Sequence, residues 1–466
     1  MNGWNGIEPH IWGGRFNRVR ISVLILAAVM VFPVLASDSV RLNARFWDMP
    51  MATSGGEPMT RASVPELDDA SIREGSGGDL PDPDKPLLGV AISGGGTRSA
   101  SAAMGQLRAL IRLGWFEDVD YLSTVSGGTW ASWPFTFLPD AISDQHYLGR
   151  YIAPEDLTEA DLTDEFPARS LGYAITHAKW RKQALMGWIS GRGDETFAYV
   201  LGEHFLRNVG LNDRKKLFAF DREQVDHIVT RHRQGCVLPG DEPLSRKCLE
   251  LGPESFYTTR PGRPFHIANS TVLPNLASQS LLNRMDSLNP SDLFRSIASD
   301  SGHEATATSG GEALIALNPA FVYPLEITPI YTGTRSGDTI LHGPLGHQGS
   351  VGGLLVESYS YDSRALHVPA PNSGPGSSSS SGYVSEYKST FLGKYRQSRY
   401  HFTHSDVLAA SGAAPQEVLS ALGLRNIGFP EFVHSSRHGA GRLTSREFSH
   451  GDGGHADNIG LPALLA

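Results

Sequence analysis

The sequence predicts an α/β fold with three αβα layers and a mostly parallel central sheet. An apolar run over 87–92 ends in glycines, and a second over 119–125 ends at Ser126. Each is typical of a buried strand that enters a tight turn. Between them, apolar residues recur at helical spacing from residue 99 until Gly114 ends the pattern. Two strands joined by a helix form the parallel unit from which α/β folds are built.

The two turns carry residue types that suit acyl transfer. Ser126 lies at a sharp strand-to-helix turn between small residues, which presents its hydroxyl to a substrate carbonyl. The first turn holds Gly94, Gly95 and Gly96. Glycines let a ligand approach the backbone closely, and N–H groups at a helix start can hold an oxyanion or a phosphate. The pair of turns therefore predicts a nucleophile beside an anion-binding loop.

Neither turn is specific when it is considered alone. Thr124 stands where the G-x-S-x-G nucleophile motif has its first glycine, and Ser99 stands where G-x-G-x-x-G has its third. The P-loop pattern G-x-x-x-x-G-K-[ST] is absent from the sequence. A plain tight turn or a nucleotide loop is the alternative for the glycine-rich turn.

Taken in order, GVAISGGGTRSA and STVSGGTW resemble the catalytic core of the patatin-like and group IV cytosolic phospholipase superfamily, and the group IV enzymes most closely. These enzymes use a serine–aspartate dyad, and their glycine-rich loop supplies the oxyanion hole. The resemblance implies that Ser126 is the nucleophile and that Asp452, in a downstream D-G-G motif, is the base. It also implies that Gly94, Gly95 and Gly96 form the oxyanion hole.

The same resemblance extends to other residues. It implies that Arg98 binds the substrate phosphate, whereas a structural charge at a helix start is the alternative. It covers residues 86–133 and 406–465 well, and the second range includes DVLAASGAAP, a segment common in patatin-like proteins. Ser411 in this segment is a weak second nucleophile, because no acid–base motif adjoins it. Relatives usually continue beyond the D-G-G motif. From the resemblance we therefore expect this chain to be a shortened product.

Other groups compete with Asp452 for the role of base. A serine hydroxyl needs a neighbouring base to take its proton, and His455 follows Asp452 in the order of a Ser–Asp–His triad. We favour direct transfer to Asp452, because a histidine three residues later in one turn is poorly placed to relay a proton from Ser126. The spacing of the potential metal ligands around this motif matches no zinc site; these residues are His450, Asp452, His455 and Asp457. We therefore expect no cofactor.

Composition limits the class of protein and its partners. The 466 residues are 40% hydrophobic, which allows a substantial core, and the net charge of −9 argues against a nucleic-acid partner. Only two cysteines are present, so the fold is not a disulfide scaffold. Cys236 and Cys248 either close one disulfide loop in an exported protein or stay free thiols.

The chain divides into three segments. Residues 1–36 carry arginines ahead of a 16-residue apolar run, which is typical of a cleaved signal peptide or an uncleaved anchor. Either one places the catalytic domain outside the cytoplasm. Residues 37–86 are polar and acidic and predict a flexible linker. Residues 87–466 form the catalytic domain, with a flexible insertion at 369–382 and a candidate lid within 135–260.

These observations predict a serine hydrolase that cleaves fatty-acyl esters of phospholipids or lysophospholipids at a membrane surface. Aromatic and basic residues over 171–189 suit contact with lipid, although a core helix with a solvated basic edge is the favoured explanation for them. The alternatives are a non-lipid esterase or thioesterase, and an inactive scaffold tethered to a membrane. Head group, acyl position, chain length and oligomeric state leave no signature in the sequence.

Overall fold

A computed structural model describes sixteen separate stretches of the chain. They are residues 39–48, 70–73, 80–82, 84–159, 161, 166–177, 179–189, 195–236, 247–273, 322–334, 339–342, 348–367, 379–386, 402–414, 428–438 and 442–465. The predicted signal or anchor at 1–36 lies outside these stretches, so it stays a prediction. Within them, no helix has the length and apolar character needed to cross a membrane.

One sheet of 12 strands organises the molecule. Its main path runs through β13 (Arg364–His367), β14 (Ser379–Glu386), β1 (Ser39–Asp48), β12 (Leu354–Glu357), β9 (Tyr331–Gly333), β8 (Tyr323–Ile327), β7 (Phe265–Leu273), β16 (Arg442–Asp452) and β15 (Glu431–His438). Every pairing along this path is antiparallel. Parallel pairing joins β2 (Gly89–Ile92) to β3 (Tyr121–Val125), β3 to β7, and β5 (Lys247–Cys248) to β1.

The prediction of a mostly parallel central sheet is therefore wrong. The strand–helix–strand unit at its start is present and its two strands are parallel, but the sheet beyond β7 alternates in direction. A parallel return needs a crossover of a dozen or more residues. Only residues 328–330 separate β8 from β9, and only residues 439–441 separate β15 from β16. Connections this short make hairpins, so the neighbouring strands run in opposite directions.

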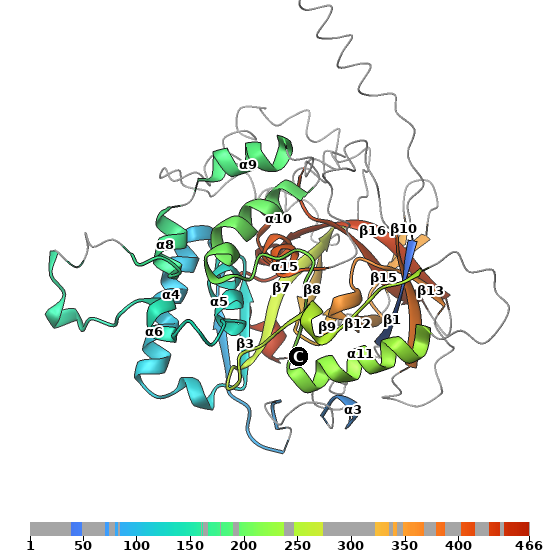
Figure 1. Cartoon of the computed structure of the whole chain (residues 1–466), viewed down its shortest axis with the longest axis horizontal. Coiled ribbons are helices and arrows are strands. Elements are labelled where there is room, and N and C mark those ends of the chain that lie inside the picture. The colour runs from blue at the N-terminus through green and yellow to red at the C-terminus, as the bar shows by residue number, and fades with distance from the viewer. Residues whose placement is uncertain are drawn as a thin grey trace, which may run out of the picture.

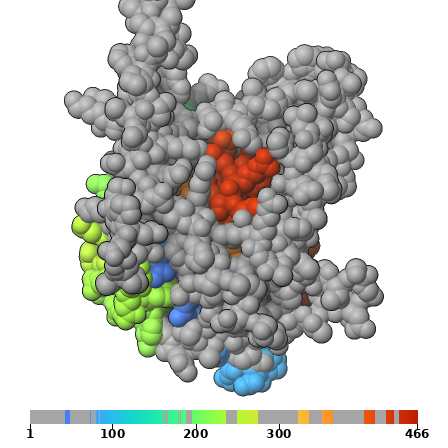
Figure 2. All heavy atoms as spheres, turned by 90° about the vertical axis from the view of Figure 1, so that its right-hand side faces the viewer, coloured from blue at the N-terminus to red at the C-terminus, as the bar shows by residue number. Residues whose placement is uncertain are grey.

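Helices pack against both the parallel and the antiparallel parts of the sheet. The longer ones are α4 (Gly96–Arg112), α5 (Gly127–Thr136), α9 (Trp180–Ile189), α11 (Arg222–Cys236) and α15 (His404–Gly412), and shorter ones include α6 (Asp144–Leu148), α8 (Leu171–Thr176), α10 (Thr196–Leu201) and α17 (Pro462–Leu465). α4 contacts α5, α6 and α8 on one flank of the molecule, and α11 packs along β1 (Figure 1). Seen from the side, α11 forms a yellow-green surface beside the blue of β1, and the C-terminal part of the chain appears in orange-red (Figure 2).

Two segments that were predicted to be flexible contain strands. β1 falls within the predicted linker, yet it pairs with β12 and β14, and Leu42, Ala44 and Phe46 on it are fully buried. Asn43 and Trp47, on the opposite face of the strand, are only 9% and 7% exposed, so both faces of β1 are covered. β14 begins inside the predicted insertion at 369–382, of which residues 369–378 lie outside the described stretches.

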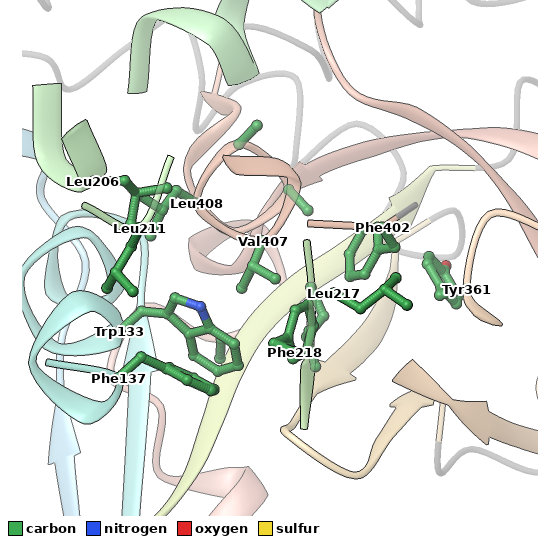
Figure 3. Packing of buried hydrophobic residues seen from close by; sticks show 14 of the residues in the cluster. Trp133, Phe137, Leu206, Leu211, Leu217, Phe218, Tyr361, Phe402, Val407 and Leu408 are labelled. Atoms are coloured by element: carbon green, nitrogen blue, oxygen red, sulfur yellow. The ribbon is translucent and has the colours of Figure 1, made fainter. Parts of the chain in front are cut away.

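The main hydrophobic core lies where α5 meets α15 and β4 (Leu217–Ala219). Trp133 on α5 directs its ring toward Phe218 on β4, with ring centroids 5.4 Å apart (Figure 3). The Trp133 indole N–H also donates to His404 Nδ1 at 2.8 Å. Because α5 begins directly after Ser126, this core fixes the helix that follows the predicted nucleophile.

Candidate active site

Ser126 occupies the turn between β3 and α5 in a strained backbone conformation. Its φ is 51° and its ψ is −120°, and its residue surface is only 3% exposed. Within the described stretches, the other non-glycine residues with positive φ are Arg169 and Asp362. Such a conformation costs about 1–3 kcal/mol and is found where function demands it. A serine on a sharp strand-to-helix turn is the geometry of a nucleophile elbow.

Strands β3 and β16 run toward each other along one edge of β7. β3 is parallel to β7 and places Val125 opposite Asn269, whereas β16 is antiparallel and places Asp452 opposite Ser270. β8 pairs with the same part of β7 and takes its other edge. Because Asn269 and Ser270 are consecutive, the ends of β3 and β16 meet at adjacent positions. Ser126 and Asp452, far apart in the sequence, therefore lie at the same point of the sheet.

The glycine-rich turn lies against both of these residues. The Gly94 N–H donates to the Asn458 carbonyl at 2.8 Å, and a Cβ on Gly94 would lie 3.3 Å from the Ser126 Cβ. A Cβ on Gly454 would lie 2.8 Å from Asn458 Oδ1 and 3.1 Å from Asp452 Oδ1. The loop that follows Asp452 thus folds back onto the glycine turn beside Ser126.

The amides of Gly95 and Gly96 are the anion donors that this turn can offer. Both residues have positive φ, 142° and 61°, which glycine adopts without steric cost. Neither amide donates a hydrogen bond to any part of the chain that the structure describes. The Gly94 amide, by contrast, is already occupied by Asn458. The positive end of α4, which starts at Gly96, adds to the attraction for an anion.

Arg98 lies in the first turn of α4, where its residue surface is exposed. The described stretches contain no ion pair or hydrogen bond to its side chain. Its guanidinium is therefore open to an anionic ligand next to the glycine turn. The phosphate contact itself stays a prediction.

The carboxylate of Asp452 is held by its own loop. Asp452 Oδ1 accepts a hydrogen bond from the Gly454 N–H at 2.7 Å, and the residue is 8% exposed. Gly453 passes so close to β7 that a Cβ there would lie 2.5 Å from the Asn269 carbonyl oxygen. The two glycines after Asp452 therefore let the loop pass close to the middle of β7.

The flanking histidines are engaged elsewhere. His450 Nδ1 lies 3.0 Å from the Phe448 carbonyl, and its Nε2 lies 2.7 Å from the Tyr361 hydroxyl. Both ring nitrogens are thereby taken, and burial lowers the pKa of His450 to about 3. His455 Nε2 lies 3.3 Å from the Ala414 carbonyl. No group of three or more potential metal ligands occurs in the stretches that the structure describes.

Two further residues lie at this site, and sequence reasoning did not foresee the contacts that either one makes there. Ser411, a weak second nucleophile by sequence, is fully buried and accepts a hydrogen bond from the Ser126 N–H at 2.9 Å. Asn458 binds the glycine turn through its carbonyl. Both lie in segments that the resemblance had covered, but only the fold shows that these segments meet beside Ser126.

Helix α9, within the candidate lid region 135–260, exposes part of its apolar surface to solvent. Leu185 and Met186 on α9 are 56% and 49% exposed. Trp180, at the start of α9, packs against Trp130 of α5 with ring centroids 6.1 Å apart. The helix thus adjoins α5, one turn beyond Ser126, and movement of α9 as a lid stays a prediction.

Comparisons with known proteins give short or distant similarities. No family model matches this chain. It is 40% identical to human cytosolic phospholipase A2 delta over 52 residues, 11% of this chain and 6% of that protein. It is 51% identical to human cytosolic phospholipase A2 zeta over 45 residues, 10% of this chain and 5% of that protein.

Among solved structures, human GIVD cytosolic phospholipase A2 is similar with a TM-score of 0.34 and 12% identity, covering 82% of this chain and 41% of that one. The chain thus spans less than half the length of each of these relatives. Both sequence comparisons show a local similarity to cytosolic phospholipases A2, over about one tenth of this chain.

Proposed function

We propose that this protein is a serine acyl hydrolase that cleaves the fatty-acyl esters of phospholipids or lysophospholipids. The observation that carries the proposal is the meeting of Ser126 and Asp452 at adjacent positions along β7. The strained turn at Ser126 supports the same chemistry, and so do the amides of Gly95 and Gly96, which donate to no residue that the structure describes. The lipid substrate is supported by the local similarity to cytosolic phospholipases A2.

The reaction proceeds in two halves. Asp452 accepts the proton of the Ser126 hydroxyl as Ser126 Oγ attacks the ester carbonyl. The N–H groups of Gly95 and Gly96 stabilise the oxyanion of the tetrahedral intermediate. Asp452 then returns the proton to the leaving alcohol oxygen, which leaves an acyl-serine. Water, deprotonated by Asp452, attacks this ester and releases the fatty acid, and Ser126 regains its proton.

Arg98 supplies substrate selection in this proposal. Its exposed guanidinium, next to the glycine turn, binds the phosphate of the lipid head group. We also propose that the partner surface is a membrane and that the catalytic domain lies outside the cytoplasm. The arginines ahead of an apolar N-terminal run support that location.

Mass spectrometry of lipid products tests the proposal. The full chain should release free fatty acid from phospholipid or lysophospholipid in mixed micelles. In Ser126→Ala and in Asp452→Asn, the rate of fatty-acid release should fall by at least about a hundredfold. Removal of the nucleophile or of the base lowers the rate of the chemical step by orders of magnitude. A short soluble ester measured in parallel identifies a non-lipid esterase if it is hydrolysed faster than the lipid. A folded protein that hydrolyses neither substrate and resists a fluorophosphonate would instead be a scaffold.

A further inference from the structure

Ser411 lies directly behind the proposed nucleophile and joins three elements. Its Oγ accepts a hydrogen bond from the Ser126 N–H at 2.9 Å and donates one to the Asn269 carbonyl at 2.7 Å. The Thr129 hydroxyl lies 2.8 Å from the same Oγ. One side chain of α15 therefore ties the turn after β3 to the middle of β7 and to the first turn of α5. Because Ser411 is fully buried, it has no access to substrate.

The proton positions in this cluster follow from its partners. The Ser411 hydroxyl hydrogen points at the Asn269 carbonyl, so its oxygen must accept from both Ser126 and Thr129. The Thr129 oxygen lies 2.9 Å from Thr124 Oγ1. Thr124 Oγ1 in turn lies 2.8 Å from His266 Nε2. Each of these side chains is buried, so the cluster forms a satisfied polar network beneath the turn.

The platform that carries Ser411 is itself fixed. In the first turn of α15, Asp406 Oδ1 accepts a hydrogen bond from the Arg214 guanidinium at 2.9 Å. The Trp130 indole N–H donates to the Leu408 carbonyl at 3.0 Å. α15 is thus anchored at its first turn and along its length, independently of Ser411. Because α15 is fixed, the hydroxyl of Ser411 can hold the backbone of Ser126 in a strained conformation. A mobile helix would instead move with the turn as the strain relaxed.

We propose that Ser411 is a positioning residue for acyl transfer, because its Oγ holds the Ser126 backbone in the conformation that presents the Ser126 hydroxyl to Asp452. The inference rests on the proposed function. Without this acceptor, the buried Ser126 N–H has no partner and the turn relaxes toward an unstrained φ. The hydroxyl then moves relative to Asp452 and to the amides of Gly95 and Gly96. The chemical step slows, while lipid binding does not change.

The experiment uses the full chain and two substitutions of different size. In Ser411→Ala the acceptor is lost, and in Ser411→Cys the shape is kept but the sulfur is a weaker acceptor. Ser360→Ala is the matched control, because Ser360 is equally buried and its hydroxyl donates to the Glu357 carbonyl at 2.8 Å, away from the turn. The measurements are the second-order rate constant of fluorophosphonate labelling, the final labelled fraction, and kcat and KM on mixed micelles.

We expect kcat and the labelling rate constant of Ser411→Ala to fall about tenfold, which is the effect of one hydrogen bond on a barrier. KM should stay within about twofold, and the final labelled fraction should equal that of the wild type. For Ser411→Cys, both rate constants should lie between those of Ser411→Ala and those of the wild type. For Ser360→Ala, both should equal those of the wild type. If Ser411→Ala fails to fold, Ser411→Cys decides the question by the same measurements.

Two outcomes overturn the inference. Ser411 is merely structural if the folded, labelled fraction drops while the remaining protein reacts at the wild-type rate. Ser411 is irrelevant if both substitutions react as the wild type does. A wild-type chain that neither labels nor hydrolyses lipid contradicts the proposed function instead, and the inference falls with it.

Discussion

Gly127, the first residue of α5, shows how closely the two glycine-rich turns approach each other. A Cβ at this position would overlap the Gly96 carbonyl oxygen and lie 2.6 Å from its carbon. We expect Gly127→Ala to lower the free energy of unfolding by about 1–3 kcal/mol, because the turns would have to move apart. The same movement should slow fluorophosphonate labelling of Ser126. Urea unfolding and the labelling rate measure the two effects.

Gly105 provides the control for this substitution. It lies in the exposed middle of α4, and a Cβ there would meet no atom within 4 Å. Gly105→Ala should raise the free energy of unfolding by about 0.5–1 kcal/mol, since alanine loses less backbone entropy in a helix. Equal stabilities for Gly127→Ala and Gly105→Ala would show that the turns do not pack as described.

The two glycines that follow Asp452 should differ in their tolerance of a side chain. A Cβ on Gly453 would lie 2.5 Å from the Asn269 carbonyl oxygen, which is backbone and cannot yield. A Cβ on Gly454 would mainly meet the side-chain oxygens of Asn458 and Asp452, which can rotate. We expect Gly453→Ala to destabilise the protein by about 1–3 kcal/mol and Gly454→Ala to have a smaller effect on stability. Thermal unfolding of both variants tests the order, and the reverse order would contradict it.

At the scale of elements, β1 should behave as part of the core although the sequence predicts a linker there. Phe46 is fully buried on this strand, between the pairings with β12 and β14. Phe46→Ala should lower the free energy of unfolding by about 3–5 kcal/mol, the usual cost of removing a buried ring. Leu113→Ala, at a residue that is 58% exposed, should change it by no more than about 0.5 kcal/mol. Urea titrations compare the two, and equal effects would place β1 outside the cooperative fold.

The elements that the sequence predicted well are those with a strong local pattern. The strands near 87–92 and 119–125 and the helix between them are present, because glycines mark their ends and apolar spacing marks their buried faces. The segment LEITPIY, over 325–331, has the apolar and β-branched composition of one strand, yet it contains the end of β8, a turn at 328–330 and the start of β9. β1 was missed although its apolar residues alternate, because the acidic and glycine-rich composition around it favoured a linker.

At the scale of the whole molecule, the sequence could not reveal which strand edges meet. The dyad prediction depended on the order of two motifs, but the pairing of β3 and β16 with consecutive residues of β7 arises from long-range register. The same holds for Ser411, whose hydroxyl reaches Ser126 only because α15 packs behind the turn. Short motifs and the resemblance that they carry therefore identified candidate residues, whereas the contacts of these residues required the fold.

Buried histidines should make the whole fold sensitive to acid. Burial lowers the pKa of His266, His404 and His450 to about 3 and that of His434 to about 4, from an ordinary 6.5. The unfolded chain therefore binds more protons than the folded protein between these values, so stability is complete above pH 6.5 and falls as the pH decreases toward 4. Each histidine contributes up to about 1.4 kcal/mol per pH unit to this slope. Urea unfolding from pH 7.5 to pH 4.5 should show a shallower slope for His404→Gln than for the wild type, whereas the exposed His227→Gln should follow the wild type. Identical slopes for all three proteins would mean that His404 is protonated in the folded state, against its burial between Trp133 and Phe218.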